Sequence, residues 1–406
     1  MRVAVDVTPL LGAPTGVAQS LRGLLAGLAS WQPDVEVAPY VLSGRAARGG
    51  SIVVAGLEAA ALPLPGALSI RVWGRLDRPS ADRWLGGADV VHGSNFVVPP
   101  MRGRPTTATI HDCWCARHPQ RCSADVAAFT AAVRRAVGRG AWLHVTTSYG
   151  AREVAEVYGA KERVAIVPFA VPTATDGVVM GRASPGVVPT APGEVPGGRA
   201  SPGVEPTAPG EGPGTRLPPS LAGRPYVLAL GALDPRKGLA GLVRAFGSVA
   251  STDRDLRLVL AGPNGPARPA IDEAIAALDP HAVDRIHVLG TVDDPTRRAL
   301  LAHALVLAYP SLDEGFGFPV LEAMAAGVPV VASTAGALPE VAGSAAALVP
   351  VGDDDALAAA LASVVTDDAL RTALVAAGRA RAGTFSWERT AHGMADLWRR
   401  AIAAGP

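Results

Sequence analysis

The sequence has few cysteines, little net charge and no long apolar run. Its 406 residues include only 3 cysteines, an odd number that argues against a disulfide framework and favours a reducing compartment, the cytoplasm. The formal net charge of +1 predicts no attraction of the whole chain to nucleic acid or anionic lipid. No apolar run reaches the roughly 18–20 residues that span a bilayer. Any membrane contact is therefore expected to be peripheral, at the inner face.

Two common nucleotide-binding motifs are also absent. The first strand and helix lack the GxGxxG pattern of nicotinamide-binding domains, and no stretch has the GxxxxGK[ST] spacing of a Walker A loop. Residues 1–16 resemble an apolar strand followed by a turn, without the long apolar region of a signal peptide. We expect neither a nicotinamide cofactor nor export through a signal peptide.

Short apolar runs alternate with helical stretches in both halves of the chain. This alternation predicts an α/β fold with two parallel, Rossmann-like sheets, and 406 residues suit two domains. The expected strands are 3–7, 35–42, 88–93, 106–112 and 142–148 in the first domain, and 226–231, 257–262, 285–290, 304–310 and 328–333 in the second. The expected helices are 17–30, 123–138, 238–250, one from Pro319 and an amphipathic one near 387–404.

Residues 172–219 separate the two halves and are dominated by Pro, Gly, Ala, Thr and Ser. This composition predicts a disordered linker between an N-terminal domain (1–171) and a C-terminal domain (220–386). The linker contains a tandem repeat, 181–194 and 198–211, whose copies differ at one position. A neutral expansion explains the repeat best; a docking segment for a proline-recognising partner is the alternative.

The stretch 304–333 predicts a strand, a glycine-bearing loop, a helix and another strand. Gly315 and Gly317 permit tight backbone geometry and close approach of a ligand. Glu314 in the loop and Glu322 in the first turn of the helix can reach one cleft, where carboxylates accept hydrogen bonds from sugar hydroxyls. Alternatively, Glu322 complements the helix dipole and Glu314 is a solvated loop charge.

A basic pair, Arg236 and Lys237, follows the expected strand 226–231. Open α/β sheets bind ligands at this carboxyl end of their strands. Two adjacent cations can hold a diphosphate and stabilise the negative charge that develops when it leaves a sugar. The unpaired amides of 316–318 can face the same phosphate or the sugar. A solvated basic turn is the alternative.

The first domain offers weaker signals. Gly16 begins a helix whose N-terminus can receive phosphate, although a simple helix-start turn explains it equally well. His111 follows the expected strand 106–110 and can hydrogen-bond sugar hydroxyls, although a lone histidine is more often structural. The Cys-x-Cys-x6-Cys spacing of the cysteines lacks the paired Cys-x2-Cys of zinc sites, so we expect no metal. Residues 70–87 interleave arginine with tryptophan, which favours a helix packed on the core over an anionic or lipidic acceptor site.

Together these motifs resemble the family 4 glycosyltransferases of the GT-B architecture. The resemblance rests on GALDPRKG (231–238), EGFGFPVLE (314–322) and EAMAAGVPVVAS (322–333), and in the first domain on PTGVAQSL (14–21), ATIHD (108–112) and VTTSYGAREVAEVYG (145–159). It implies two domains facing across a cleft, with a GDP- or UDP-sugar held mainly by the second and the acceptor by the first. It also implies that a C-terminal helix, 387–406, crosses back to the first domain.

The resemblance also assigns roles to individual residues. Glu314 would lie by the transferred sugar, Glu322 on the ribose, and the basic pair on the diphosphate. The amides of the 316–318 loop would contact sugar or phosphate. Many relatives have arginine after the glycine of the phosphate loop, where this chain has Ala232. The predicted catalytic residues are Glu314, Lys237, Arg236 and His111, and the predicted donor-binding residues are Gly16, Gly231, Phe316, Gly317, Phe318 and Glu322.

The implied function is a metal-independent hexosyltransferase, with mannose as one candidate sugar, that retains anomeric configuration. Its acceptor would be a glycan, a lipid-linked sugar or a small molecule. We expect Lys237→Ala to abolish transfer with little loss of folding. The alternatives are another GT-B activity, a nucleotide-sugar epimerase or phosphorylase, and a non-catalytic regulator that binds nucleotide or carbohydrate.

Overall fold

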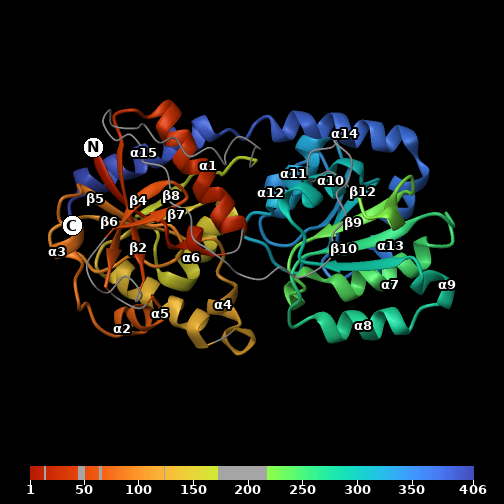
Figure 1. Cartoon of the computed structure of the whole chain (residues 1–406), viewed down its shortest axis with the longest axis horizontal. Helices are drawn as coiled ribbons and strands as arrows, with labels where there is room; N and C mark the ends of the chain where they lie inside the picture. Colours follow the sequence, from red (N-terminus) through yellow and green to blue (C-terminus); the bar gives the residue numbers. More distant parts are fainter. Residues whose placement is uncertain (13–14, 44–50, 64–65, 123, 172–216) are drawn as a thin grey trace, which may run out of the picture.

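The chain folds into two α/β domains, each built on its own sheet, as Figure 1 shows for this computed structural model. The first sheet has eight strands in the order β3-β4-β2-β1-β5-β6-β7-β8, and the second has six in the order β11-β10-β9-β12-β13-β14. Among the described residues all strand pairs are parallel except β3 with β4. The predicted pair of Rossmann-like domains is therefore confirmed. The structure describes residues 1–12, 15–43, 51–63, 66–122, 124–171 and 217–406.

The first domain contains every strand expected from its sequence and three more. Its strands are β1 (Arg2–Asp6), β2 (Glu36–Leu42), β3 (Ser51–Val54), β4 (Leu57–Leu62), β5 (Val90–Gly93), β6 (Thr106–Thr109), β7 (Trp142–Val145) and β8 (Val164–Ile166). Its helices are α1 (Gly16–Trp31), α2 (Gly66–Trp73), α3 (Asp82–Leu85), α4 (Trp114–Arg117), α5 (Ala124–Gly138) and α6 (Ser148–Tyr158).

The second domain repeats the alternation of strand and helix. Its strands are β9 (Tyr226–Leu230), β10 (Arg257–Ala261), β11 (Ile286–Gly290), β12 (Val306–Tyr309), β13 (Val330–Ser333) and β14 (Ala347–Val349). Its helices are α7 (Leu239–Val249), α8 (Arg268–Ala276), α9 (Pro280–Val283), α10 (Asp294–His303), α11 (Phe318–Ala326), α12 (Leu338–Ala342), α13 (Asp354–Thr366) and α14 (Asp368–Ala382), and α15 (Trp387–Ala404) follows them.

Two expectations about the first domain are wrong. Residues 70–87 do not form one helix, because α2 ends at Trp73 and α3 begins only at Asp82. Trp73 is buried in the core, whereas Trp84 is partly buried beneath the Arg83 guanidinium, so this stretch packs on the protein.

The cysteines provide the second correction. Cys115 and Cys122 form a disulfide with their Cα atoms 5.8 Å apart, and Cys113 is free and buried. The short helix α4 and a 3-10 turn over Pro119–Arg121 bring the two sulfur atoms together, which the spacing alone did not indicate. The cysteine count therefore no longer argues for a reducing compartment.

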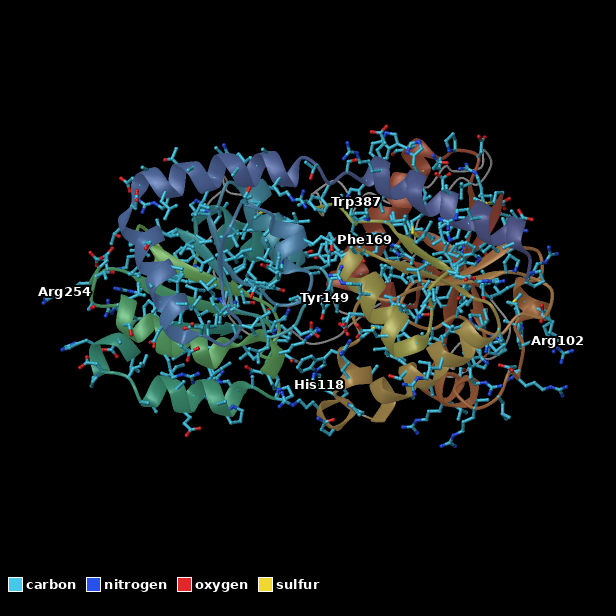
Figure 2. All side chains as sticks on the ribbon, turned by 180° about the vertical axis from the view of Figure 1, so that it is seen from behind. Arg102, His118, Tyr149, Phe169, Arg254 and Trp387 are labelled. Atoms are coloured by element: carbon cyan, nitrogen blue, oxygen red, sulfur yellow. A yellow bond between two sulfur atoms is a disulfide. The ribbon has the colours of Figure 1, made fainter. Side chains whose placement is uncertain are left out.

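The C-terminal helix α15 packs on the first domain, although it follows the second in sequence. The Trp387 indole donates to the carbonyl of Val171 at 3.1 Å, and Thr390 Oγ1 donates to that of Pro168 at 2.7 Å. Phe169 lies beside Trp387 where the two domains meet, as Figure 2 shows, with ring centroids 6.1 Å apart. One hydrophobic cluster consequently runs through both domains.

Most of the predicted linker, with both copies of the repeat, lies outside the described residues. Residues 217–219 are described, and Leu217 packs against the hydrophobic cluster that spans the domains. The last residues assigned to the linker therefore belong to the folded second domain.

We predict that Gly23→Ala lowers the melting temperature. Gly23 of α1 faces α15, and a methyl group there would overlap the indole ring of Trp387. Such overpacking costs about 1–3 kcal/mol, more than the ~1 kcal/mol by which alanine favours a helix over glycine. Gly138→Ala is the matched control, because a methyl group there meets no atom within 4 Å. Equal melting temperatures for the two variants would contradict the described packing of α15 on α1.

Candidate active site

The site lies where loops after β6 and β7 in the first domain meet loops after β9 and β12 in the second. Thr146 and Thr147 donate hydrogen bonds to the carbonyl of Gly315 at 3.3 and 3.4 Å. The carboxylate of Glu340 accepts from the amides of Ser148 and Tyr149, at the N-terminus of α6, at 2.7 and 3.0 Å. Residues far apart in sequence thus hold the two domains together around one cleft.

Lys237 and Glu314 form an ion pair at the centre of this cleft. The Glu314 side chain is buried and that of Lys237 is 14% exposed, and Oε1 of Glu314 accepts hydrogen bonds from Lys237 Nζ and, at 2.9 Å each, from the hydroxyls of Tyr309 and Ser311. Lys237 Nζ also donates to Tyr309 at 2.8 Å. The structure thus brings together the two groups that the sequence assigned to different ligands.

Mutual attraction keeps this pair charged despite its burial. Burial acts to raise the pKa of Glu314, but Lys237 and Arg236 outweigh it and bring the pKa below its usual value. Burial acts to lower the pKa of Lys237, but Glu314 and Tyr309 outweigh it and raise that pKa. Both groups are therefore ionised across the neutral range.

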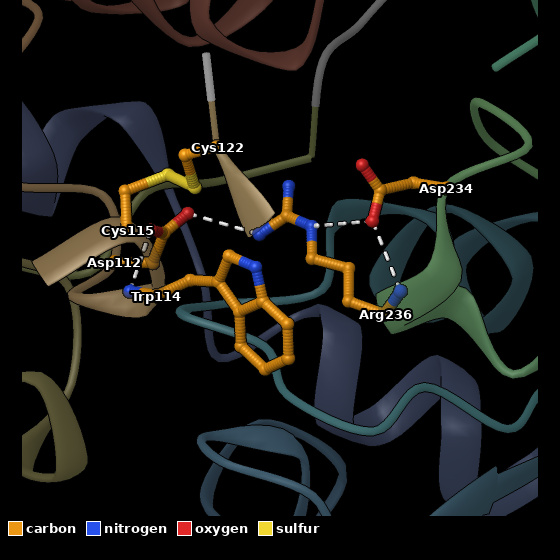
Figure 3. Close-up of a disulfide and its surroundings, with 6 residues drawn as sticks. All are labelled: Asp112, Trp114, Cys115, Cys122, Asp234 and Arg236. Carbon is orange, nitrogen blue, oxygen red and sulfur yellow. Dashed lines mark hydrogen bonds and ion pairs between the residues drawn. A yellow bond between two sulfur atoms is a disulfide. The ribbon is translucent and has the colours of Figure 1, made fainter. Parts of the chain in front are cut away.

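Arg236 links the two domains. Its Nη1 pairs at 3.0 Å with Asp112 of the first domain, and its Nε lies 3.9 Å from Asp234, as Figure 3 shows. Asp112 also accepts from the amide of Trp114 at 3.1 Å, beside the disulfide. Burial acts to lower the pKa of Arg236, but Asp112 and Glu314 outweigh it and raise the pKa. The predicted diphosphate cations are thus both balanced by carboxylates in this structure.

Glu322 lies deeper in α11 than the sequence predicted. The helix begins at Phe318, so Glu322 is its fifth residue and belongs to the second turn, where the helix dipole contributes little. Its side chain is 5% exposed; Oε2 pairs with Arg297 of α10, while Oε1 is buried and accepts no hydrogen bond from any described residue. An unpaired buried carboxylate oxygen is costly unless a ligand donates to it.

His111 lies at the cleft, and one of its two ring nitrogens already makes a hydrogen bond to the protein. Its Nε2 donates to the carbonyl of Ser94 at 3.1 Å, which leaves Nδ1 as the acceptor of the neutral ring. Burial lowers the pKa of His111 from its ordinary value. A neutral His111 can therefore accept a hydrogen bond from a sugar hydroxyl through Nδ1.

The glycine loop before α11 is shaped by close contacts. A Cβ on Gly315 would overlap the carbonyl oxygen of His111, and Gly317 has a φ of 94°, in the left-handed region. The rings of Phe316 and Phe318 pack against Phe169 of the first domain, at 6.3 and 5.9 Å between centroids. Among the described residues, none accepts a hydrogen bond from the loop amides of 316–318, which remain available to a ligand.

The remaining glycines lie on the two sides of the cleft. Gly16 begins α1, capped by Thr15, and its nearest neighbour across the cleft is Phe318. Gly231 follows β9 and has a φ of 141°, with Lys237 beside it. A cavity beside His111 has a volume of about 10 Å³, room for a single water.

Several site residues were not predicted from the sequence: Asp112, Tyr309, Ser311, Arg297 and Glu340. Tyr309 is the last residue of the buried strand β12, so its position in the sequence indicates a core residue and not a site residue. Asp112 directly follows His111, so its position at a strand end was a usable signal. Arg297 has no local signal, because its partner Glu322 lies on another helix.

No group of three His, Cys, Asp or Glu side chains in the described part of the chain could hold a metal ion. None of the helices within the described ranges is long and apolar enough to cross a membrane.

The paired domains and their cleft define the GT-B class of glycosyltransferases, and comparisons with known proteins identify the family. Residues 14–175 match the family model described as Glycosyltransferase Family 4, and residues 224–367 match the one described as Glycosyl transferases group 1. The two matches cover most of the chain. The chain belongs to the family 4 type of glycosyltransferases.

Relatives and solved structures agree with this. The O-antigen chain mannosyltransferase B of Escherichia coli is 37% identical over 171 residues, 41% of this chain and 44% of the relative. The MMP alpha-(1->4)-mannosyltransferase of Mycolicibacterium hassiacum is 38% identical over 188 residues, 44% of each protein. The match thus spans less than half the length of these relatives. A structure described as trehalose-6-phosphate from E. coli bound with UDP-2-fluoro glucose has the same fold, with a TM-score of 0.66, 13% identity, and 98% of this chain and 99% of that chain covered.

The ion pair of Lys237 and Glu314 predicts that loss of either charge destabilises the fold. From the sequence, by contrast, we expected Lys237→Ala to cause little loss of folding. Lys237→Met and Glu314→Gln each leave one buried charge without its partner, which typically costs about 3–5 kcal/mol. The double variant removes both charges and should melt at a higher temperature than either single variant. Thermal unfolding of the three variants measures this coupling; losses that simply add would mean that the two groups do not interact.

Proposed function

We propose that the chain transfers a hexose from a nucleotide-diphosphate sugar to an acceptor with retention of configuration. The observation that carries the proposal is the cluster formed by Arg236, Lys237 and Glu314 at the cleft, together with the unpaired Oε1 of Glu322 in α11, the helix that follows the glycine loop. The names of the two mannosyltransferase relatives support mannose as the transferred sugar. A glycan, a lipid-linked sugar or a small molecule would accept it.

In this proposal the bond between the sugar C1 and the diphosphate oxygen breaks. A bond from C1 to the acceptor oxygen forms on the same face, and the acceptor proton passes to the departing diphosphate. Arg236 and Lys237 would stabilise the charge on the leaving group, because fixed cations in a desolvated cleft need no reorganisation. To reach them the diphosphate would displace Asp112 from Arg236.

Glu314 is better suited to orienting groups than to attacking the sugar. Its Oε1 already accepts hydrogen bonds from Lys237, Tyr309 and Ser311, and its pKa is lowered. A carboxylate so engaged is a weak nucleophile and a poor general acid. We therefore assign it to holding Lys237 and contacting the transferred sugar, with His111 accepting a sugar hydroxyl.

A binding screen tests the donor assignment. UDP-, GDP- and ADP-sugars are compared by ligand-detected NMR and thermal shift, and the best binder is then incubated with a panel of acceptors. A glycosylated acceptor supports transfer. Free epimer or sugar phosphate would support an epimerase or phosphorylase, and binding without turnover would support a regulator.

We predict that Lys237→Met and Arg236→Gln each lower kcat by about 10²–10³-fold, because each removes a fixed donor from the leaving group. Arg244→Gln is the control, since the Arg244 side chain is 57% exposed and pairs with Asp354 of α13. Initial rates on one donor and acceptor pair measure the effect. Near-wild-type rates for Lys237→Met would refute the assignment.

A further inference from the structure

The carboxylate of Glu322 is held asymmetrically. Oε2 faces the guanidinium of Arg297, whereas Oε1 is buried and has no donor among the described residues. A carboxylate free to rotate would exchange its two oxygens, but a guanidinium paired with one oxygen makes the two inequivalent. The structure thus distinguishes one oxygen that is bound by the protein from one that is left for a ligand.

The anchor of this arrangement is α10. Asp293 caps the helix by accepting from the amide of Thr296 at 2.9 Å, and Leu300 is fully buried in the core. The Arg297 side chain, 23% exposed, therefore extends from a fixed backbone. The positive charge of Arg297 also offsets the desolvation penalty of the buried Glu322 carboxylate, which would be uncompensated without a cation beside it.

We propose that Arg297 is a positioning residue for ribose recognition. By holding Oε2 of Glu322, it directs Oε1 to accept a hydrogen bond from a ribose hydroxyl of the bound nucleotide. The inference rests on the proposed function, because it requires a nucleotide in the cleft. It assigns Arg297 no contact with the nucleotide itself, since the guanidinium already faces Glu322.

The test compares ribose with deoxyribose. Titration calorimetry measures the binding of the nucleoside diphosphate preferred by the wild type, UDP or GDP, and of its 2′-deoxy and 3′-deoxy analogues. The wild type should bind at least one analogue roughly tenfold or more weakly, because a hydrogen bond to a charged group is lost. Arg297→Gln should weaken binding of the ribonucleotide and leave binding of that analogue almost unaffected. The ratio of the dissociation constants of the analogue and the ribonucleotide should then fall toward one.

Three further variants sharpen the comparison. Arg298→Gln is the matched control, because Arg298 is the next residue of α10 and is exposed. In the double variant with Glu322→Gln, loss of Arg297 should cause no further loss of discrimination. Arg297→Lys keeps a cation beside Glu322 and should retain part of the discrimination, and it replaces Arg297→Gln if thermal unfolding shows that the latter does not fold.

The outcomes separate this inference from the proposed function. If the wild type binds no nucleoside diphosphate, the proposed function fails and the inference falls with it. If the wild type discriminates against a deoxy analogue but the Arg297 variants do so equally well, only the inference is overturned. An equal loss of affinity for all three nucleotides would show that Arg297 contacts the nucleotide directly, which also overturns it.

Discussion

The buried pair of Lys237 and Glu314 constrains the rest of the cleft. Neither charge is tolerable alone at this depth, so each requires the other. The hydroxyls of Tyr309 and Ser311 add two more hydrogen bonds to Oε1 of Glu314. Arg236 extends the network to Asp112 of the first domain at 3.0 Å. The second domain thereby places Arg236 and Lys237 after strand β9, and each of them is paired with a carboxylate.

The two domains also share apolar contacts that do not depend on these charges. Phe169 of the first domain packs against Phe318 of α11 and Trp387 of α15, and the same hydrophobic cluster continues into both cores. The cavity beside His111, about 10 Å³, has room for no more than a single water. Any separation of the domains would break the polar contact of Asp112 with Arg236 and the aromatic contact of Phe169 with Phe318.

Local sequence patterns predicted the fold because it depends on local order, and the candidate site follows from the same patterns. The strand preceding Arg236 and the glycine loop preceding α11 place charged residues at the carboxyl ends of parallel strands, whatever the rest of the chain does. The hairpin of β3 and β4 was missed because alanines dominate β4. The ion-pair partners of the site residues could not be predicted from the sequence. Asp112 and Arg236, for example, are 124 residues apart, and only the tertiary fold brings them together. The depth of Glu322 was misjudged because α11 begins one residue before Pro319.

The charges of the cleft also suggest how donor binding and domain movement are linked. In the proposed reaction, a diphosphate would bring negative charge to cations that Asp112 and Glu314 already neutralise, so it would replace a carboxylate rather than simply add to the site. Asp112 is the carboxylate that would leave, because it belongs to the other domain and is 23% exposed, whereas Glu314 is buried and its Oε1 accepts three hydrogen bonds. Exchange of Asp112 for phosphate on Arg236 would therefore release one polar contact between the domains at the moment when the donor binds, and would leave the pair of Lys237 and Glu314 in place to meet the sugar.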